Sequence, residues 1–595
     1  MTSFTAPDKE SHDMAVKNAL FLASICGLLT VSGQHLGPAA TAQIRKSVSG
    51  IPAAAEPGRK KLIGHSWDLL RVTPEDLHRN LEKLEALPLD GISITLYIKS
   101  PDGKLRQSSA AYTDQPWDRQ WLTEDLEHIK AVCSGKLRHN LISSFWAPHR
   151  RLAWNDDAAW VNAAHNFAVL AWLAKQSGCK GILMDPEEYK SPKTQQYTLL
   201  PEDGDYQTTA ALARQRGAQV MRAMSAEFPD AVFLSFWLLS MNPQLYLRSD
   251  QAANVAGAGN LWVPFINGLL DALPPDAVMV DATENAYSHR FETYDFYKSA
   301  LQISRNALCL VAPENHAKYR NQVQVGFGLY LDMYSNTDPT SRWYFPELDG
   351  SRLKRLQANF NQAMQTADEY CWVYGEKYDW IKWDVTRNNK DNETWEDILP
   401  GFSRTLVLLR DPLAAGRQWL AEKQKTGDLV NLVSNPECTP ATGAAMPAPA
   451  EDWVAGSLPP GWSFWQLQEK IGSFGLDSTK GRGDNFSARA EGTRTSCIIV
   501  KAPVQAGRLY VVETWCQAGN NPVVRVRWAY DGAWKVPDLD VFISYETTPD
   551  AQGWRRGVGV AEVPAGVNEL VILMSDCLGP GQTVWFDQPA VYAVE

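Results

Sequence analysis

From residue 60 onward, short apolar runs alternate with longer stretches in which apolar residues recur every three or four positions. Residues 61–70 (KLIGHSWDLL) are typical of a strand that ends in polar residues. Thr73 and the three residues after it (PED) then supply an N-cap, a proline and two acids, which usually open a helix. Within residues 211–228, helical spacing is kept by Val220, Met221, Met224 and Phe228. The pattern therefore predicts repeated strand–helix units.

Eight apolar runs predict eight strands. They lie at residues 61–70, 91–98, 140–146, 181–184, 231–237, 277–280, 323–334 and 370–374. Eight strand–helix units over about 370 residues match the size of a (β/α)8 TIM barrel. We therefore predict an α/β fold with this barrel as a catalytic domain at 43–434, and a doubly wound open sheet is the alternative. No GxGxxG or GxxxxGK[ST] motif follows a strand, so a nucleotide cofactor gains no support.

The pattern changes after residue 434. A Pro-, Ala- and Thr-rich stretch predicts a linker at 435–452. Short alternating runs separated by Gly and Pro then predict an all-β sandwich or jelly roll at 453–595. Residues 461–465 (GWSFW), 503–507 (PVQAG) and 584–592 (VWFDQPAVY) resemble the jelly-roll modules of carbohydrate-binding families 4 and 9. The resemblance implies the jelly-roll fold, and leaves open whether the domain binds sugar or only packs against the enzyme.

The N-terminus is typical of an export signal. A lysine precedes the apolar run 19–31, and the small residues 39–42 resemble an A-x-A cleavage site. The run is too short to span a bilayer. We predict a signal peptide with an N-terminal extension at 1–42 and a secreted or periplasmic protein. The eight cysteines beyond it permit disulfides, or are buried apolar side chains, and their spacing predicts no metal site.

Composition and charge narrow the function classes. Hydrophobic residues make up 45% and charged residues 21% of the 595 positions, as in soluble globular proteins. The 57 Lys and Arg against 68 Asp and Glu give a net charge of −11, the wrong sign for broad binding to nucleic acid. The 23 tryptophans suit large cores or stacking on the apolar faces of sugars.

The strongest candidate for chemistry is the end of the fourth predicted strand, residues 181–189 (GILMDPEEY). In an extended chain, Asp185 and Glu187 point to the same side and Glu188 to the opposite side. Close like charges raise one pKa, and a carboxylic acid that stays protonated near neutral pH can protonate a glycosidic oxygen. The run resembles the D-x-E strand end of family 18 chitinases, which implies Glu187 as the proton donor with Asp185 as its helper. A solvated loop is the alternative.

A second carboxylate would complete the site. The candidates are Asp281 and Glu284 after the sixth strand, Asp332 in the seventh and Glu376 after the eighth. A retaining pair would lie about 5–5.5 Å apart and an inverting pair about 6.5–9.5 Å apart. Alternatively, Asp185 is the nucleophile and Asp281 the acid, an arrangement similar to several α-glycosidase families.

Other polar and aromatic residues near the predicted strand ends are candidates for substrate contacts. They are His65, Trp67, Asp68, Tyr97, Trp146, Glu188, Trp237, Tyr287, Asp332, Tyr334 and Glu376. Together these features predict an exported glycoside hydrolase that cleaves a poly- or oligosaccharide by carboxylate acid/base catalysis, without a metal or organic cofactor. The alternative is a non-catalytic glycan-binding surface protein with a degenerate barrel.

Overall fold

The computed structural model describes residues 60–440 and 458–594. Within these ranges it leaves out 102, 104, 108–110, 113–114, 149–150, 190, 201, 247–248, 385–392, 468–470, 520–521, 532, 535–538, 577 and 579–580. The predicted signal peptide and most of the predicted linker lie outside the described residues. Among the helices that are described, none combines the length and the apolar character needed to cross a bilayer.

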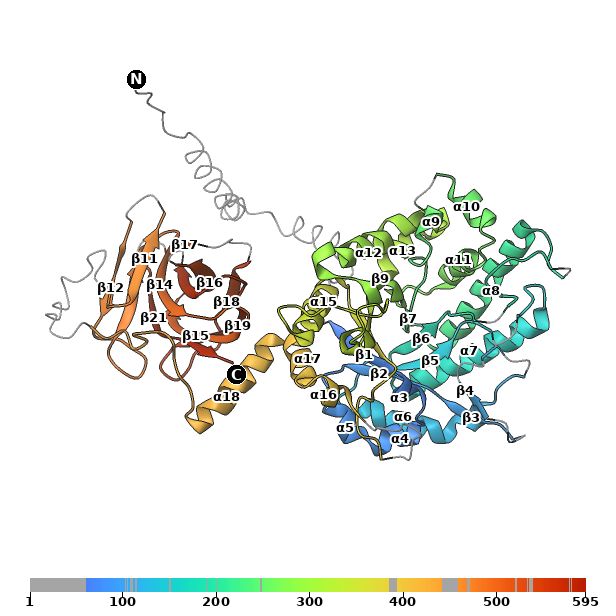
Figure 1. Ribbon diagram of the computed structural model, residues 1–595, viewed down its shortest axis with the longest axis horizontal. Helices are drawn as coiled ribbons and strands as arrows, with labels where there is room; N and C mark the ends of the chain where they lie inside the picture. The colour runs from blue at the N-terminus through green and yellow to red at the C-terminus, as the bar shows by residue number, and fades with distance from the viewer. Residues whose placement is uncertain are drawn as a thin grey trace, which may run out of the picture. The chain divides into compact units, whose positions relative to one another are not determined.

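Eight parallel strands form a closed barrel (Figure 1). They are β1 (Lys61–Ser66), β2 (Gly91–Ile94), β5 (Leu141–Phe145), β6 (Gly181–Asp185), β7 (Val232–Ser235), β8 (Val278–Thr283), β9 (Val323–Tyr330) and β10 (Tyr370–Gly375). The last strand pairs with the first over six residues, from Lys61 with Tyr370 to Ser66 with Gly375. This closure confirms the predicted TIM barrel and rules out an open sheet.

Helices follow the strands and cover the outside of the barrel (Figure 1). Up to the end of the barrel they are α3 (Trp67–Leu70), α4 (Pro74–Arg79), α5 (Leu81–Glu85), α6 (Thr123–Ser134), α7 (Asp157–Ser177), α8 (Tyr206–Glu227), α9 (Pro243–Tyr246), α10 (Gln251–Gly257), α11 (Trp262–Ala272), α12 (Asp295–Ser304), α13 (His316–Gln322), α14 (Asp332–Ser335) and α15 (Arg352–Thr366). Three more follow β10: α16 (Trp395–Ile398), α17 (Phe402–Arg410) and α18 (Pro412–Thr426). The predicted N-cap at Thr73 is present as a capping box with Asp76.

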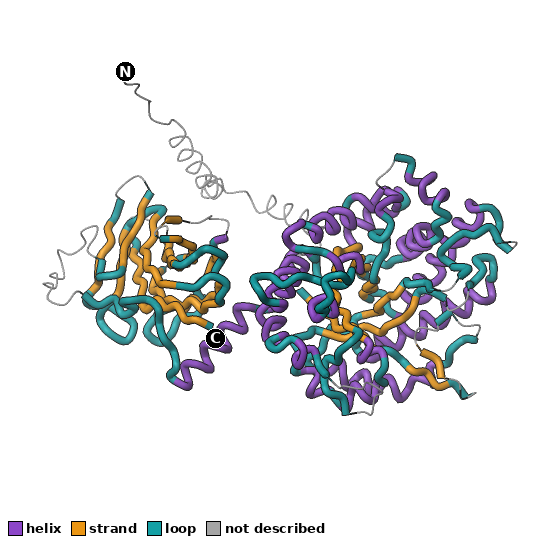
Figure 2. Tube along the Cα trace, viewed as in Figure 1, coloured by secondary structure: helices purple, strands orange, loops and turns teal. Residues whose placement is uncertain are grey.

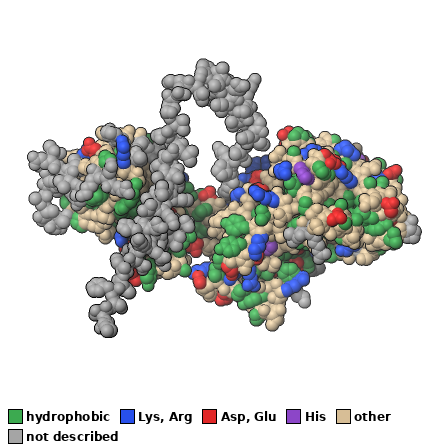
Figure 3. All heavy atoms as spheres, turned by 90° about the horizontal axis from the view of Figure 1, so that it is seen from above, with side chains coloured by type: hydrophobic (Ala, Val, Ile, Leu, Met, Phe, Trp, Pro, Cys, Tyr) green, Lys and Arg blue, Asp and Glu red, His purple; other side chains and the backbone are tan. Residues whose placement is uncertain are grey.

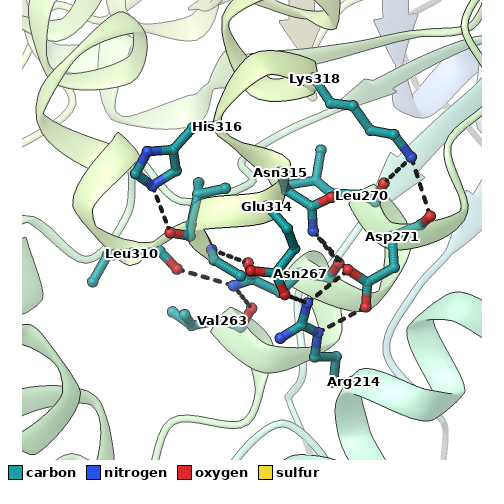
Figure 4. A network of polar contacts seen from close by, with 12 residues as sticks. Arg214, Val263, Asn267, Leu270, Asp271, Leu310, Glu314, Asn315, His316 and Lys318 are labelled. Carbon is teal, nitrogen blue, oxygen red and sulfur yellow. Dashed lines mark hydrogen bonds and ion pairs between the residues drawn. The ribbon is translucent and has the colours of Figure 1, made fainter.

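Helices α8 and α11 approach each other closely at two glycines. A Cβ on Gly268 would lie 1.9 Å from the carbonyl oxygen of Arg214, so only glycine fits there. Beside this crossing, Arg214 donates two hydrogen bonds of 2.7 Å to Asp271 (Figure 4). Asn315 donates to the same carboxylate at 2.7 Å, which ties the start of α13 to α11. These contacts fasten the outer helices on one side of the barrel.

The C-terminal region contains two antiparallel sheets (Figure 2). Its strands are β11 (Trp462–Gln466), β12 (Ser473–Asp477), β13 (Ser487–Glu491), β14 (Ser496–Pro503), β15 (Leu509–Ala518), β16 (Val523–Tyr530), β17 (Ala533–Trp534), β18 (Val541–Ser544), β19 (Arg555–Glu562), β20 (Glu569–Asp576) and β21 (Thr583–Ala593). One sheet has the order β11-β14-β20-β16-β17, with β18 on β16, and the other β12-β13-β21-β15-β19. Apolar side chains of both sheets share one core, which confirms the predicted all-β region.

Candidate active site

Three carboxyl groups lie at the carboxyl ends of two barrel strands. Asp185 is the last residue of β6, and its side chain accepts a hydrogen bond of 3.0 Å from the backbone N–H of Glu187. Glu284 begins the 3-10 helix η4 (Glu284–Ser288) directly after β8. Its backbone N–H donates to the carbonyl of Phe236, beyond β7, at 2.9 Å. The charge of Glu187 acts on both Asp185 and Glu284, so the three groups form one electrostatic cluster.

Burial and mutual repulsion favour protonation in this cluster. Burial raises the pKa of Glu284 to about 7, and the negative charge of Glu187 adds to the shift. Burial also raises the pKa of Asp185 well above its usual range, again with a contribution from Glu187. Near neutral pH, these two groups therefore hold protons more readily than free carboxyl groups do.

Tyr189 contacts the cluster although sequence reasoning did not select it. Its hydroxyl donates a hydrogen bond to Glu187 Oε2, and 76% of the residue is exposed. The sequence did contain a signal for Tyr189: side chains alternate in an extended chain, so residues 185, 187 and 189 lie on one side.

Three stacked tyrosines form a wall beside Glu284. Tyr287 lies 5.1 Å from Tyr330 and 6.1 Å from Tyr374, measured between ring centroids. The charges of Glu284 and Glu187 help to raise the pKa of the buried Tyr287, which places this ring near both carboxyl groups. Tyr330 and Tyr374 also interact with Glu376 through their hydroxyl groups. Of the three rings, only Tyr287 was among the residues selected from the sequence.

The wall continues to the end of β1. The ring of His65 stacks on Tyr374 at 5.5 Å, and its Nδ1 lies 2.8 Å from Ser93 Oγ. Burial lowers the pKa of His65 to about 3, so its imidazole is neutral at pH 7. Trp67, which is 40% exposed, has a side-chain interaction with Tyr374 and carries the guanidinium of Arg71 4.6 Å from its ring.

Beneath these rings, Trp372 fills the barrel interior. Its side chain is fully buried and stacks on Phe236 at 4.1 Å between centroids. Gly328, on the neighbouring β9, leaves room for it, because a Cβ there would lie 2.7 Å from the indole. The indole N–H donates to the carbonyl of Ala282 at 2.8 Å. Trp372 thus links β10 to Ala282 of β8, which lies two residues before Glu284.

Four of the predicted acidic site residues hold loops in place. Asp68 accepts hydrogen bonds from Trp380 N and Trp383 Nε1, and Glu188 accepts hydrogen bonds from Thr194 N and Gln195 N. Asp281 accepts hydrogen bonds from Leu239 N, Ser240 N and Ser240 Oγ. Asp332 accepts a hydrogen bond from Glu376 N. Each of these four residues is at most 9% exposed. Their carboxylates already have partners within the chain, unlike a carboxylate that is open to substrate.

The side chains of four predicted aromatic residues have other surroundings. Trp146 packs in the core against Phe167 at 4.6 Å, and the buried Tyr334 accepts a hydrogen bond from Asn359 at 3.1 Å. Tyr97 lies in β3 (Tyr97–Lys99), which pairs with β4 (Leu105–Gln107) outside the barrel. Trp237 is half-buried beyond the end of β7.

Within the part of the chain that the structure describes, no group of three or more His, Cys, Asp or Glu is arranged to hold a metal ion. On the face shown in Figure 3, acidic and basic side chains are interspersed over the described surface. The carboxyl cluster of Asp185, Glu187 and Glu284 differs from this mixed surface, because it brings together acidic groups alone.

No protein-family model matches the sequence, and no curated protein is detectably similar to it. Among solved structures, the chain is similar to the enzymatically active domain of bacteriophage CBA120 tailspike protein 4, with a TM-score of 0.21 and 11% identity over 28% of this chain and 22% of that chain. It is also similar to the CBM22-1–GH10 modules of Clostridium thermocellum xylanase 10B (TM-score 0.18, 6% identity, 22% and 26% of the two chains). A third match is TmCBM61 in complex with β-1,4-galactotriose, with a TM-score of 0.18 and 13% identity over 28% of this chain and 99% of that chain. TM-scores this low assign the chain to none of these families.

Replacing Asp68 by alanine is expected to destabilise the barrel. Its Oδ2 accepts from Trp380 N at 2.8 Å and from Trp383 Nε1 at 3.0 Å, so the substitution leaves two buried donors unpaired. Such a loss costs about 2 kcal/mol or more. Denaturant unfolding of the full chain measures this cost. Asp68→Asn keeps an acceptor oxygen and should lose less, and equal losses in both variants would contradict the hydrogen-bonding role.

Proposed function

We propose that this protein is a glycoside hydrolase that cleaves glycosidic bonds with Glu187 and Glu284. One observation carries the proposal: a carboxyl group with a pKa of about 7 lies in the field of a second carboxylate, at the strand ends of a TIM barrel. Catalytic groups gather at this end of the fold, and paired carboxyl groups are the usual catalysts of glycoside hydrolysis. The partly exposed rings of Trp67 and Tyr374 offer flat surfaces on which sugar rings can pack.

In this proposal, Glu284 is the proton donor. Its raised pKa keeps it protonated near neutral pH, so it can donate a proton to the glycosidic oxygen as the bond breaks. Glu187 receives a hydrogen bond from Tyr189 and acts as the carboxylate. It either attacks the anomeric carbon or takes a proton from the attacking water. The resemblance to family 18 chitinases implies Glu187 as the acid instead, and the raised pKa of Glu284 favours the exchanged assignment.

The other predicted residues support this pair in different ways. We assign substrate contact to Trp67, Tyr374 and Glu376, which are at least partly exposed, and the buried Tyr287 and Tyr330 support the ring of Tyr374. Asp185 positions Glu187 by accepting a hydrogen bond from the backbone N–H of Glu187, and His65 supports the ring of Tyr374. Asp68, Glu188, Asp281 and Asp332 position the loops that surround the site. Export by the predicted signal peptide is part of the same proposal, because an enzyme that acts on a polysaccharide must reach its substrate.

Substitution of either glutamate by glutamine is expected to abolish most of the activity. Glu187→Gln and Glu284→Gln each remove a group that can ionise, and general acid or base catalysis contributes about 10²- to 10⁴-fold to the rate. Product release from a panel of neutral, acetamido and acidic glycans measures the effect. Glu82→Gln, at an exposed position of α5, is the matched control and should retain the wild-type rate.

Two outcomes would contradict the proposal. In one, either site variant keeps the wild-type rate on a glycan that the wild type cleaves. In the other, the wild type binds glycans of the panel without releasing product, which favours the non-catalytic glycan-binding protein.

The pH dependence should identify the proton donor. Because Glu284 must be protonated to act, the rate is expected to fall as pH rises through about 7, the pKa of this group. Well above that pH, kcat/KM should fall roughly tenfold per unit. The profile of kcat/KM from acidic to alkaline pH measures it. A rate that increases through this range would show that Glu284 acts in its ionised form and contradict its assignment as the donor.

A further inference from the structure

Two buried cysteines meet at the end of the barrel opposite the carboxyl cluster. Cys133 lies in the last turn of α6, and Cys179 lies two residues before β6. Their sulfur atoms are 3.6 Å apart. The residues are 7% and 4% exposed. Forty-six positions separate them in the sequence, so the fold alone creates this contact.

The backbone around Cys179 holds the two thiols together. Gly178 ends α7 in the left-handed conformation, with φ of 84°, and the N–H of Cys179 donates to the carbonyl of Ala174 at 2.9 Å. A Cβ on Gly178 would lie 3.5 Å from the Cβ of Cys133, so this turn packs directly on the cysteine. The next residue, Lys180, lies directly before β6 and donates its backbone N–H to the carbonyl of Asn140 at 2.8 Å.

Polar neighbours favour the thiolate on Cys133. The thiol of Cys179 lowers the pKa of Cys133 by hydrogen bonding to it, and Asn140 and Arg138 act in the same direction against the effect of burial. The Asn140 amide nitrogen lies 3.4 Å from Cys133 Sγ. Because the thiolate is the form that attacks disulfides, Cys133 is the better nucleophile of the two.

We propose that Cys133 and Cys179 form a disulfide when the protein meets a disulfide oxidant. A bonded pair has its sulfur atoms about 2.05 Å apart, so they must approach by roughly 1.6 Å. The thiolate of Cys133 attacks a sulfur of the oxidant and releases a thiolate from it, giving a mixed disulfide. Cys179 loses its proton and displaces the second oxidant thiolate. Two electrons and two protons thus pass to the oxidant, which leaves as two thiols.

The bond would stabilise the barrel without touching the proposed chemistry. It joins α6 to the amino end of β6, whereas Asp185 is at the carboxyl end of that strand. Residues at the amino-end face of a TIM barrel serve stability. A cross-link that closes a loop of this length restricts the unfolded chain and raises the free energy of unfolding. Such a bond also suits the oxidising compartment that the predicted signal peptide implies.

Peptide mapping of the full chain tests the proposal. The chain is treated with oxidised glutathione or with dithiothreitol, then unfolded, alkylated and digested without reduction. We expect a peptide that links Cys133 to Cys179 only after oxidation, and a melting temperature a few degrees above that of the reduced protein. Full alkylation of both thiols after oxidation would overturn the proposal.

Two variants separate this bond from other thiol chemistry. In Cys179→Ser, the difference in melting temperature between oxidised and reduced protein should disappear. Cys309→Ser removes an exposed thiol elsewhere and should leave that difference unchanged. A difference that persists in Cys179→Ser, or that is lost in Cys309→Ser, would contradict the assignment. If Cys179→Ser does not fold, the peptide map of the wild-type chain decides by itself.

Discussion

The pairing of β1 with β10 closes the sheet, and the candidate site depends on this closure. In an open sheet, the carboxyl ends of the first and last strands would lie at opposite edges. The closed barrel instead places His65 of β1 beside Tyr374 of β10, with ring centroids 5.5 Å apart. Tyr287, after β8, then stacks on rings from β9 and β10. One continuous rim thus carries both the aromatic wall and the carboxyl cluster.

Burial of like charges gives this rim its chemical character. Burial withholds hydration from the ionised form of Glu284, and the charge of Glu187 repels it, so the pKa of Glu284 rises from 4.5 to about 7. Because folding raises this pKa, ionising Glu284 destabilises the folded state as pH increases through this range. A destabilising group in a folded protein often marks a functional site. The stacked tyrosines and the loops held by Asp68, Glu188 and Asp281 provide the rigid surroundings that maintain the shift.

The strands could be predicted from the sequence because each is a short apolar run with a distinct boundary. Each of the eight predicted runs overlaps a barrel strand, since burial on both faces of a parallel sheet demands continuous apolar residues. The approach of Asp185 to Glu187 also follows from local geometry. The hydrogen-bond donors to the other acids could not be predicted in this way. Asp68 and Asp281 accept hydrogen bonds from irregular loops, and the paths of these loops leave no pattern in the sequence.

The aromatic residues were harder to assign for a related reason. A tryptophan or tyrosine at a strand end faces either the barrel mouth or the surrounding helices, and the choice depends on the rotation of the strand. Trp146 packs against Phe167, on α7, whereas Tyr374 stacks on Tyr330 and forms part of the wall. Trp372 lies within β10, and Tyr330, the last residue of β9, lies inside the longer predicted run 323–334. An aromatic residue inside a strand is also typical of ordinary core, so position alone did not distinguish them.

An infrared titration of carboxyl groups in the full chain shows whether Glu284 holds a proton near neutral pH, when the wild type is compared with Glu284→Gln and Glu187→Gln. Asp185 and Asp587 also have raised pKa values, so the signal of Glu284 is the difference between the wild type and Glu284→Gln. That difference should contain a protonated carboxyl band that disappears as pH rises through about 7, and in Glu187→Gln this band should titrate at lower pH. Spectra of the wild type and Glu284→Gln that titrate identically, or a difference band that is already lost below pH 5, would show that Glu284 does not hold a proton near neutral pH and would contradict its assignment as the donor.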